Sequence, residues 1–174
     1  YHLHFLDIKQ LEKNQKTLSI LNKINAVQKI DDLLRDEELV LNLIIDLYSN
    51  AIRKRENHAL DDAMVRLYRL IELVSQYGLA KYNITTSNPN YEKFPELKSK
   101  YKETTLSLYN QERELPFEIG IKDGHIILFI LNDDIWKSKN IEDLKKFLGP
   151  IRLRDNSIIA HGIETINDKA FQKI

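Results

Sequence analysis

The sequence contains no cysteine, and it has only 5 glycines and 4 prolines among its 174 residues. The absence of cysteine excludes disulfide bonds, thiolate nucleophiles and cysteine-ligated zinc, and it fits an intracellular protein, which we expect to be cytoplasmic. Few glycines and prolines leave few positions for tight turns. Long helices are therefore favoured over a fold rich in sheet.

The sequence also lacks long apolar runs and an excess of either charge. No apolar run reaches the roughly 18 residues that a membrane-spanning helix needs, so no membrane contact is expected. Lys+Arg and Asp+Glu balance at 26 each, so any anion-binding site must be local. With no signal peptide and no initiator methionine, the chain is expected to be part of a longer protein, and residues 1–174 suit a single domain.

The first half of the chain is predicted to be helical. Apolar residues recur at helical spacing over residues 3–25 and 31–56. A third helix is expected to begin near Asp61 and Asp62, whose carboxylates suit the N-terminal end of the helix dipole, and to stop at Gly78. Because only "NHAL" separates the second and third helices, they are expected to form an antiparallel hairpin.

The second half alternates loops and helices. Residues 82–97, polar and with two prolines, are interpreted as a surface loop, with helical sequence resuming at their end. Residues 115–135 are ambiguous between a short β-hairpin insertion and a buried helix capped by Asp123, which we favour. "NIEDLKKFLGP" predicts a short helix with Asn140 as N-cap and Gly149 as its stop. The expected fold class is an all-α helical bundle.

A further helix is expected to start at the proline before "IRLRDNSIIAHGI". Its Arg154 and His161 stand seven residues apart, which returns them to nearly the same face, about 10 Å apart along the axis. Ser157 shares this edge, and Asp155 and Asn156 can cap or orient the arginine. The alternative is an ordinary helix in which the arginine is solvated and the histidine caps or packs.

An arginine and a histidine on one edge suit cleavage of a phosphodiester. Arginine is a permanently charged, forked donor for phosphate oxygens, and histidine exchanges protons near neutral pH. In RNA the 2′-hydroxyl supplies the nucleophile, so neither a metal nor another cofactor is required. Because about 10 Å is long for joint action on one phosphate, two copies of the helix are expected to meet across a two-fold axis in a homodimer.

Other polar residues have simpler interpretations. Arg66, Arg69 and Glu72 lie three residues apart on one expected helix and suit a surface ladder of ion pairs. The alternative is that one of the arginines binds RNA or braces the last helix. His2 and His4 could face a metal ion, but no third ligand is evident, so no metal site is predicted.

Histidines and aromatic residues elsewhere are assigned structural positions. His58 and His125 are interpreted as surface residues. Four aromatic residues at helical or helix-end positions are assigned to the core rather than to base stacking, Tyr48, Tyr68, Tyr77 and Trp136.

Two stretches resemble a known family. "RDNSIIAHG", residues 154–162, resembles the R-x(4–6)-H signature of HEPN domains, including the polar residue directly after the arginine. "DDAMVRLYRLIELVSQYGLAK", residues 61–81, resembles the "DDAxxRLYRxxE" helix of CRISPR-associated proteins that join a CARF sensor domain to a HEPN effector. "NAIRKR", residues 50–55, is similar to the "NAxRR"-like helix end that precedes it there. Together the resemblance covers about 31–163.

The resemblance implies a HEPN bundle that dimerises through its active-site face and cuts single-stranded RNA without a metal, leaving 2′,3′-cyclic phosphate and 5′-hydroxyl ends. In it Arg154 would hold the phosphate, and His161 would handle the proton or position the 2′-hydroxyl. Cyclic oligoadenylate bound to a CARF domain would activate it, and this chain is expected to lack that sheet-rich sensor. Two alternatives stay open: a non-catalytic HEPN module for dimerisation or RNA binding, and a HEPN toxin paired with an antitoxin.

Overall fold

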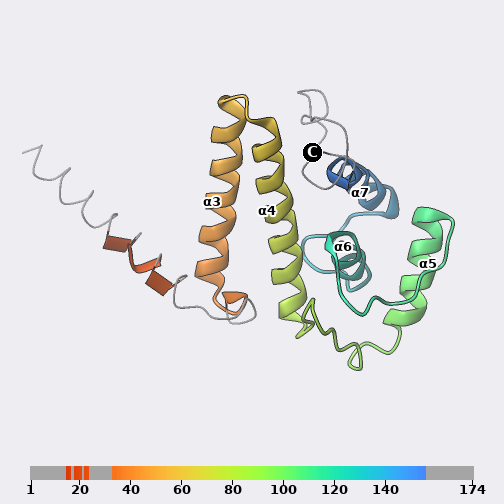
Figure 1. Ribbon diagram of the computed structural model, residues 1–174. Coiled ribbons are helices and arrows are strands. Elements are labelled where there is room, and N and C mark those ends of the chain that lie inside the picture. The colour runs from red at the N-terminus through yellow and green to blue at the C-terminus, as the bar shows by residue number, and fades with distance from the viewer. Residues whose placement is uncertain (1–14, 17, 21, 24–32, 156–174) are drawn as a thin grey trace, which may run out of the picture. The chain divides into compact units, whose positions relative to one another are not determined.

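The computed structural model describes four stretches of the chain, 15–16, 18–20, 22–23 and 33–155 (Figure 1). Within these stretches all regular structure is helical and no strand occurs, so the predicted all-α fold is confirmed. The chain divides into two compact units, 1–43 and 44–174.

In the first unit, the described residues between 15 and 23 are helical, and the rest of the helix predicted over 3–25 lies outside the described part. The next helix, α3 (Glu37–Glu56), ends as predicted but begins later than residue 31. Asp36 sets this start, because its carboxylate accepts the N–H of Leu39 at 3.1 Å. An aspartate N-cap thus overrides the apolar periodicity that placed the start too early.

A tight turn joins α3 to α4 (Leu60–Lys81), and the chain reverses there as predicted (Figure 1). His58, exposed as predicted, takes a positive φ of 58° in this turn. Across the turn, Lys54 Nζ lies 2.8 Å from the carboxylate of Asp62. Asp61 and Asp62 lie in the first turn of α4, where carboxylates complement the helix dipole.

The predicted stop of this helix at Gly78 is wrong, because Gly78 is a packing residue. A Cβ at Gly78 would lie 2.8 Å from a methyl carbon of Leu128, so the glycine allows α4 to approach the neighbouring helix closely. α4 ends at Lys81, and Asn83, with a φ of 57°, turns the chain away in the left-handed conformation common after helix ends.

Residues 82–96 form the predicted loop, and α5 (Leu97–Tyr109) begins where helical sequence was expected to resume. Within this loop, the hydroxyl of Tyr91 donates to the carbonyl of Pro116 at 2.9 Å. This hydrogen bond connects the loop to the segment that follows α5. α5 packs against α6 and α7.

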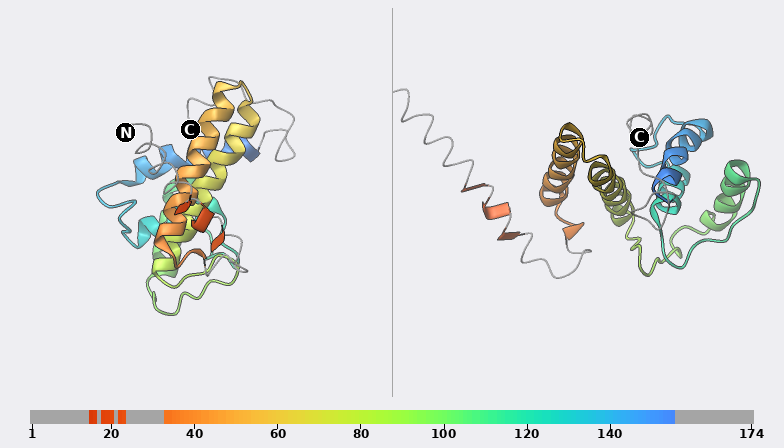
Figure 2. Two further views of the ribbon diagram at one scale, coloured as in Figure 1. Left: turned by 90° about the vertical axis from the view of Figure 1, so that its left-hand side faces the viewer. Right: turned by 45° about the horizontal axis from the view of Figure 1, so that its top comes forward.

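The ambiguous stretch at 115–135 contains α6 (Ile121–Ile130), so the helix is confirmed and the β-hairpin alternative is wrong. Gly120 is its N-cap, whereas Asp123, predicted as the cap, lies in the first turn. α6 packs against α4, α5 and α7 (Figures 1 and 2). A helix surrounded in this way can be apolar on all sides, and three successive side chains at its centre have no exposed surface, Ile126, Ile127 and Leu128.

The last described helix, α7 (Ile141–Asp155), begins with the predicted cap; for 152–155 only the backbone is described. The carboxamide oxygen of Asn140 accepts the N–H of Glu142 at 2.9 Å and that of Asp143 at 3.1 Å. In return, the carboxylate of Asp143 accepts the N–H of Asn140 at 3.1 Å, which completes a capping box.

α7 passes through Gly149 and Pro150, where a stop and a new helix were predicted. Leu148 and Ile151, on either side, are only 4% and 5% exposed. Their burial in the core outweighs the helix-breaking tendency of the two residues between them. Arg154 therefore lies in the same helix as the N-cap, and its predicted place near the start of a separate helix is wrong.

Burial corrects some of the assignments made to ring side chains. Tyr68 and Trp136 are 2% and 6% exposed and belong to the core, as predicted, and Tyr77 is half-buried. Tyr48, at 55% exposed, was wrongly assigned to the core. His125 was wrongly assigned to the surface: it is 2% exposed because α6, which carries it, is packed against three other helices.

Candidate functional site

Two of the five residues predicted to form or support the cleavage site lie in α7. Arg154 and Asp155 are placed there by their backbone, while Asn156, Ser157 and His161 lie outside the described residues. The edge shared by Arg154 and His161 therefore stays a prediction. The structure does describe the helix that leads to Arg154 and the elements that contact this helix.

The helix propensity of α7 is low in the turn that precedes Arg154. Relative to alanine, glycine costs about 1 kcal/mol and proline about 3 kcal/mol inside a helix, and Gly149 and Pro150 are adjacent. Pro150 also has no N–H to donate to the carbonyl of Lys146, four residues earlier. The helix at this point therefore depends on contacts with other elements.

Tyr68 of α4 makes a direct contact of this kind. Its hydroxyl oxygen lies 2.8 Å from the carbonyl oxygen of Pro150 and 2.9 Å from that of Ile151. The side chain is 2% exposed, so the hydroxyl donates in surroundings of low dielectric, where hydrogen bonds are stronger than in water. The stretch 61–81 thus contacts the helix that carries Arg154.

The two arginines of α4 differ in their contacts. Arg69 Nη1 lies 2.6 Å from the carboxylate of Glu72, which confirms this ion pair of the predicted ladder. Arg66 is half-buried. The hydrogen bond from Lys54 is the largest cause that lowers the pKa of Asp62, and the charge of Arg66 adds a smaller effect in the same direction. RNA binding by Arg66 or Arg69 stays a prediction.

A cleft of about 670 Å³ opens between the C-terminal end of α5, the start of α6 and α7. Gly149 of α7 lines it, five residues before Arg154 and so about 7.5 Å away along the helix axis. Three cationic side chains line the same cleft, Arg113, Lys122 and Lys145. Because the overall charge is balanced, an anion-binding site would have to be local, and these three cations form a local group of that kind.

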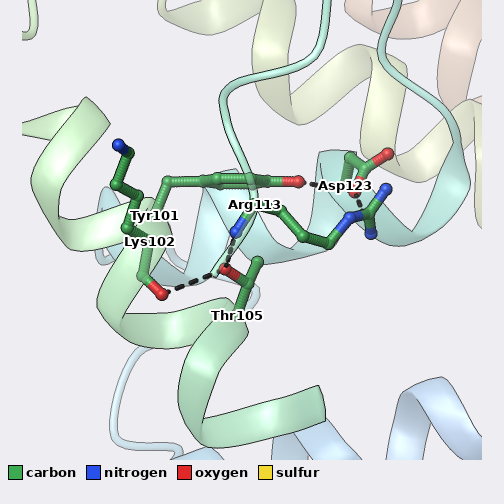
Figure 3. Close-up of polar contacts among 5 residues, drawn as sticks. All are labelled: Tyr101, Lys102, Thr105, Arg113 and Asp123. Carbon is green, nitrogen blue, oxygen red and sulfur yellow. Dashed lines mark hydrogen bonds and ion pairs between the residues drawn. The ribbon is translucent and has the colours of Figure 1, made fainter. Parts of the chain in front are cut away.

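Arg113 is held at this cleft by both its side chain and its backbone (Figure 3). The hydroxyl of Tyr101 donates to Asp123 Oδ1 at 2.6 Å, and Arg113 Nη1 lies 3.3 Å from the same oxygen. The Thr105 hydroxyl accepts the backbone N–H of Arg113 and donates to the Lys102 carbonyl, both at 3.0 Å. Burial, with the bond to Asp123, raises the pKa of Tyr101, so its hydroxyl stays a donor.

His125 is unsuited to exchange protons with a substrate. Burial lowers its pKa to about 4, against the smaller opposing effect of the Ile71 carbonyl, which lies 3.3 Å from Nε2. Its ring packs edge-on against Trp136 and Phe147, with centroids 5.8 and 4.6 Å apart. His125 is therefore a neutral core residue at pH 7.

In the ranges that the structure describes, no group of three or more His, Cys, Asp or Glu side chains could hold a metal ion. His2 and His4 lie outside these ranges. Nor does any helix in the described ranges have the length and apolar character to cross a membrane.

The helices α3 to α7 form an all-α structure, the architecture that the resemblance to HEPN domains implied. The Csm6 HEPN domain family matches residues 33–174, most of the chain, and the chain belongs to this family of CRISPR-associated proteins. Membership indicates an RNase-type domain. The match contains both stretches that carried the resemblance, 61–81 and 154–162. Comparison with curated proteins found no match.

Two features near the site were missed from the sequence. The cations of the cleft come from the loop after α5, the first turn of α6 and α7, so no motif connects them. Tyr68 was assigned to the core, but its acceptors stand 82 and 83 residues later in the chain. The presence of Tyr68 in the family stretch "DDAMVRLYRLIE" indicated that the residue could matter, but the stretch does not reveal that its hydroxyl contacts α7.

Proposed function

We propose that this domain is a metal-independent endoribonuclease that cleaves single-stranded RNA in the cytoplasm, as the effector of a CRISPR-associated defence protein. The match of the Csm6 HEPN domain family across 33–174 carries the proposal, because this range contains Arg154 and His161 at the spacing of the HEPN signature. The domain acts as a homodimer and is controlled by cyclic oligoadenylate bound to a CARF domain outside this chain.

In the proposed reaction, the 2′-hydroxyl oxygen of one nucleotide attacks its adjacent phosphorus, and the bond from phosphorus to the 5′-oxygen of the next nucleotide breaks. The products are a 2′,3′-cyclic phosphate and a 5′-hydroxyl. His161 accepts or returns the proton, or positions the 2′-hydroxyl, because imidazole exchanges protons near neutral pH. Arg154 neutralises the charge that builds on the non-bridging oxygens, and Asp155 or Asn156 orients its guanidinium.

The basic cleft supports the proposal as a path for the RNA backbone. Its three cations line one cavity, and Gly149 in its wall precedes Arg154 in the same helix. Contacts of this kind bind phosphates irrespective of base sequence. Lys145 is exposed, and Arg113 is held in place by Asp123.

Replacing His161 tests the catalytic assignment. His161→Ala is expected to lower the rate of cleavage of a fluorogenic single-stranded RNA at least about a hundredfold, because a proton-transfer group contributes that much or more. The dimer and the circular dichroism spectrum should be unchanged. His58→Asn is the matched control, since His58 is an exposed histidine with a positive φ that asparagine tolerates.

The other outcomes discriminate between mechanisms. Full activity of His161→Ala would contradict the catalytic role of His161, and loss of wild-type activity in EDTA would point to a metal-dependent reaction. A wild-type domain that binds RNA with a salt-dependent affinity, yet yields no cyclic-phosphate ends, would identify a non-catalytic HEPN module.

A further inference from the structure

Tyr68 joins the stretch 61–81, which carries part of the family resemblance, to the turn of α7 that precedes the second such stretch, 154–162. Its ring belongs to the hydrophobic core, with 2% of the residue exposed. Its hydroxyl proton is shared between two main-chain acceptors of α7, the carbonyl of Pro150 at 2.8 Å and that of Ile151 at 2.9 Å. Tyr68 therefore contacts the backbone of α7, at residues 150 and 151.

These two carbonyls have a specific place in the helix. In an α-helix the carbonyl of residue i accepts the N–H of residue i+4. The acceptors that Tyr68 contacts are thus those that hold the backbone of Arg154 and Asp155. Gly149 and Pro150 weaken α7 at this same place, because glycine is flexible and proline removes one hydrogen bond.

We propose that Tyr68 is a positioning residue, whose hydroxyl fixes α7 across the glycine–proline interruption and so sets the place of Arg154. The inference rests on the proposed function, in which Arg154 holds the scissile phosphate. A small displacement suffices to matter, since a misplacement of about 1 Å at a reacting centre can cost about a hundredfold in rate.

Tyr68→Phe tests this inference, because it removes the hydroxyl and keeps the buried ring. We expect kcat for single-stranded RNA to fall about ten- to a hundredfold while KM stays within about twofold, as for an interaction that affects the transition state more than substrate binding. By NMR, the amide hydrogens of Arg154 and Asp155 should exchange with solvent faster than in the wild type.

Tyr91→Phe is the matched control. The hydroxyl of Tyr91 also donates to a proline carbonyl, that of Pro116, at 2.9 Å, but in the segment between α5 and α6. Its removal should leave kcat and both exchange rates unchanged. A general effect of losing a tyrosine hydroxyl that donates to a proline carbonyl would appear in both variants.

A second variant separates positioning from a contact with RNA. Pro150→Ala restores an N–H for the carbonyl of Lys146 and removes the helix interruption. Added to Tyr68→Phe, it should recover most of kcat and slow the exchange of both amides. A residue that touched the substrate would not be rescued in this way.

The two proposals fail separately. Equal kcat and equal amide exchange in Tyr68→Phe and Tyr91→Phe would overturn the positioning role while the proposed function stands. A wild-type domain that does not cleave RNA would contradict the proposed function instead, and the amide exchange would still decide whether Tyr68 holds α7.

Discussion

His125 is a buried polar residue that is uncharged at pH 7. It is 2% exposed, its Nε2 lies 3.3 Å from the carbonyl of Ile71, and its ring packs against Trp136 and Phe147. Burial lowers its pKa to about 4, so the folded state keeps the imidazole neutral well below pH 6.5. An unfolded chain, by contrast, binds a proton there at an ordinary pKa near 6.5.

This difference predicts a pH dependence of stability. Between pH 6.5 and 4 the unfolded state binds a proton that the folded state excludes, so stability falls as pH decreases through this window. From pH 7.5 to pH 5 the contribution of His125 is a loss of about 2 kcal/mol. Urea unfolding at the two pH values measures it.

His125→Phe isolates the effect, because phenylalanine keeps the ring contacts and cannot titrate. The variant should lose about 2 kcal/mol less than the wild type over the same pH interval. His58→Asn, which removes an exposed histidine, should lose as much as the wild type. Identical losses in wild type and His125→Phe would show that His125 titrates normally.

Among the helices, the contact of α4 with α6 depends on small residues. A Cβ at Gly124 of α6 would overlap Ser75 Oγ of α4, and one at Gly78 of α4 would lie 2.8 Å from Leu128 of α6. At each of these two contacts, one helix therefore has a glycine opposite a side chain of the other helix. Both glycines are buried, so neither approach can be relieved by moving a side chain into solvent.

Gly124→Ala is accordingly expected to destabilise the domain, by about 1–3 kcal/mol, since overpacking forces side chains or helices to shift. Gly149→Ala is the control in α7: no atom lies within 4 Å of its Cβ position, and alanine favours a helix over glycine by about 1 kcal/mol. The free energy of unfolding in urea should fall in the first variant and rise in the second.

Removing the hydroxyl of Ser75 should remove most of the steric overlap in the Gly124→Ala variant. Ser75→Ala combined with Gly124→Ala leaves a nearest approach of 3.4 Å, to the Cβ at 75, and should recover most of the lost stability. If Gly124→Ala were as stable as the wild type, the close approach of α4 and α6 would not constrain the fold.

For the molecule as a whole, the distribution of charge matters more for the proposed binding of RNA than the net charge does. Lys+Arg and Asp+Glu balance at 26 each, so the proposed binding of RNA would have to depend on local groups such as the three cations of the cleft. Binding through phosphates releases counterions, and the slope of log K against log salt for single strands is about −0.7 per phosphate neutralised.

Lys145→Ala is expected to weaken single-stranded RNA binding at low salt and to reduce the magnitude of this slope by about 0.7, measured by fluorescence anisotropy over a salt series. Lys137→Ala is the control, since Lys137 is 68% exposed, pairs with Asp134 and does not line the cleft. Equal slopes in both variants would place the RNA elsewhere.

Local patterns predicted most of the helices correctly. The cap at Asn140, the loop at 82–96 and the start of α5 depend on neighbouring residues, so the sequence contains their causes. The stop predicted at Gly78 was wrong because Gly78 packs against Leu128 of α6. The stop predicted at Gly149 was wrong because the burial of Leu148 and Ile151 outweighs the local tendency of glycine to end a helix.

From the sequence alone follow the all-α class, the family stretches and the chemical types at 154–161, because periodicity and side-chain identity are properties of short segments. Only the tertiary structure decided that His125 is buried and neutral, that Tyr68 contacts α7, and that three separate cations line one cleft. The physical reason is that distances between residues far apart in the chain are set by how the helices pack.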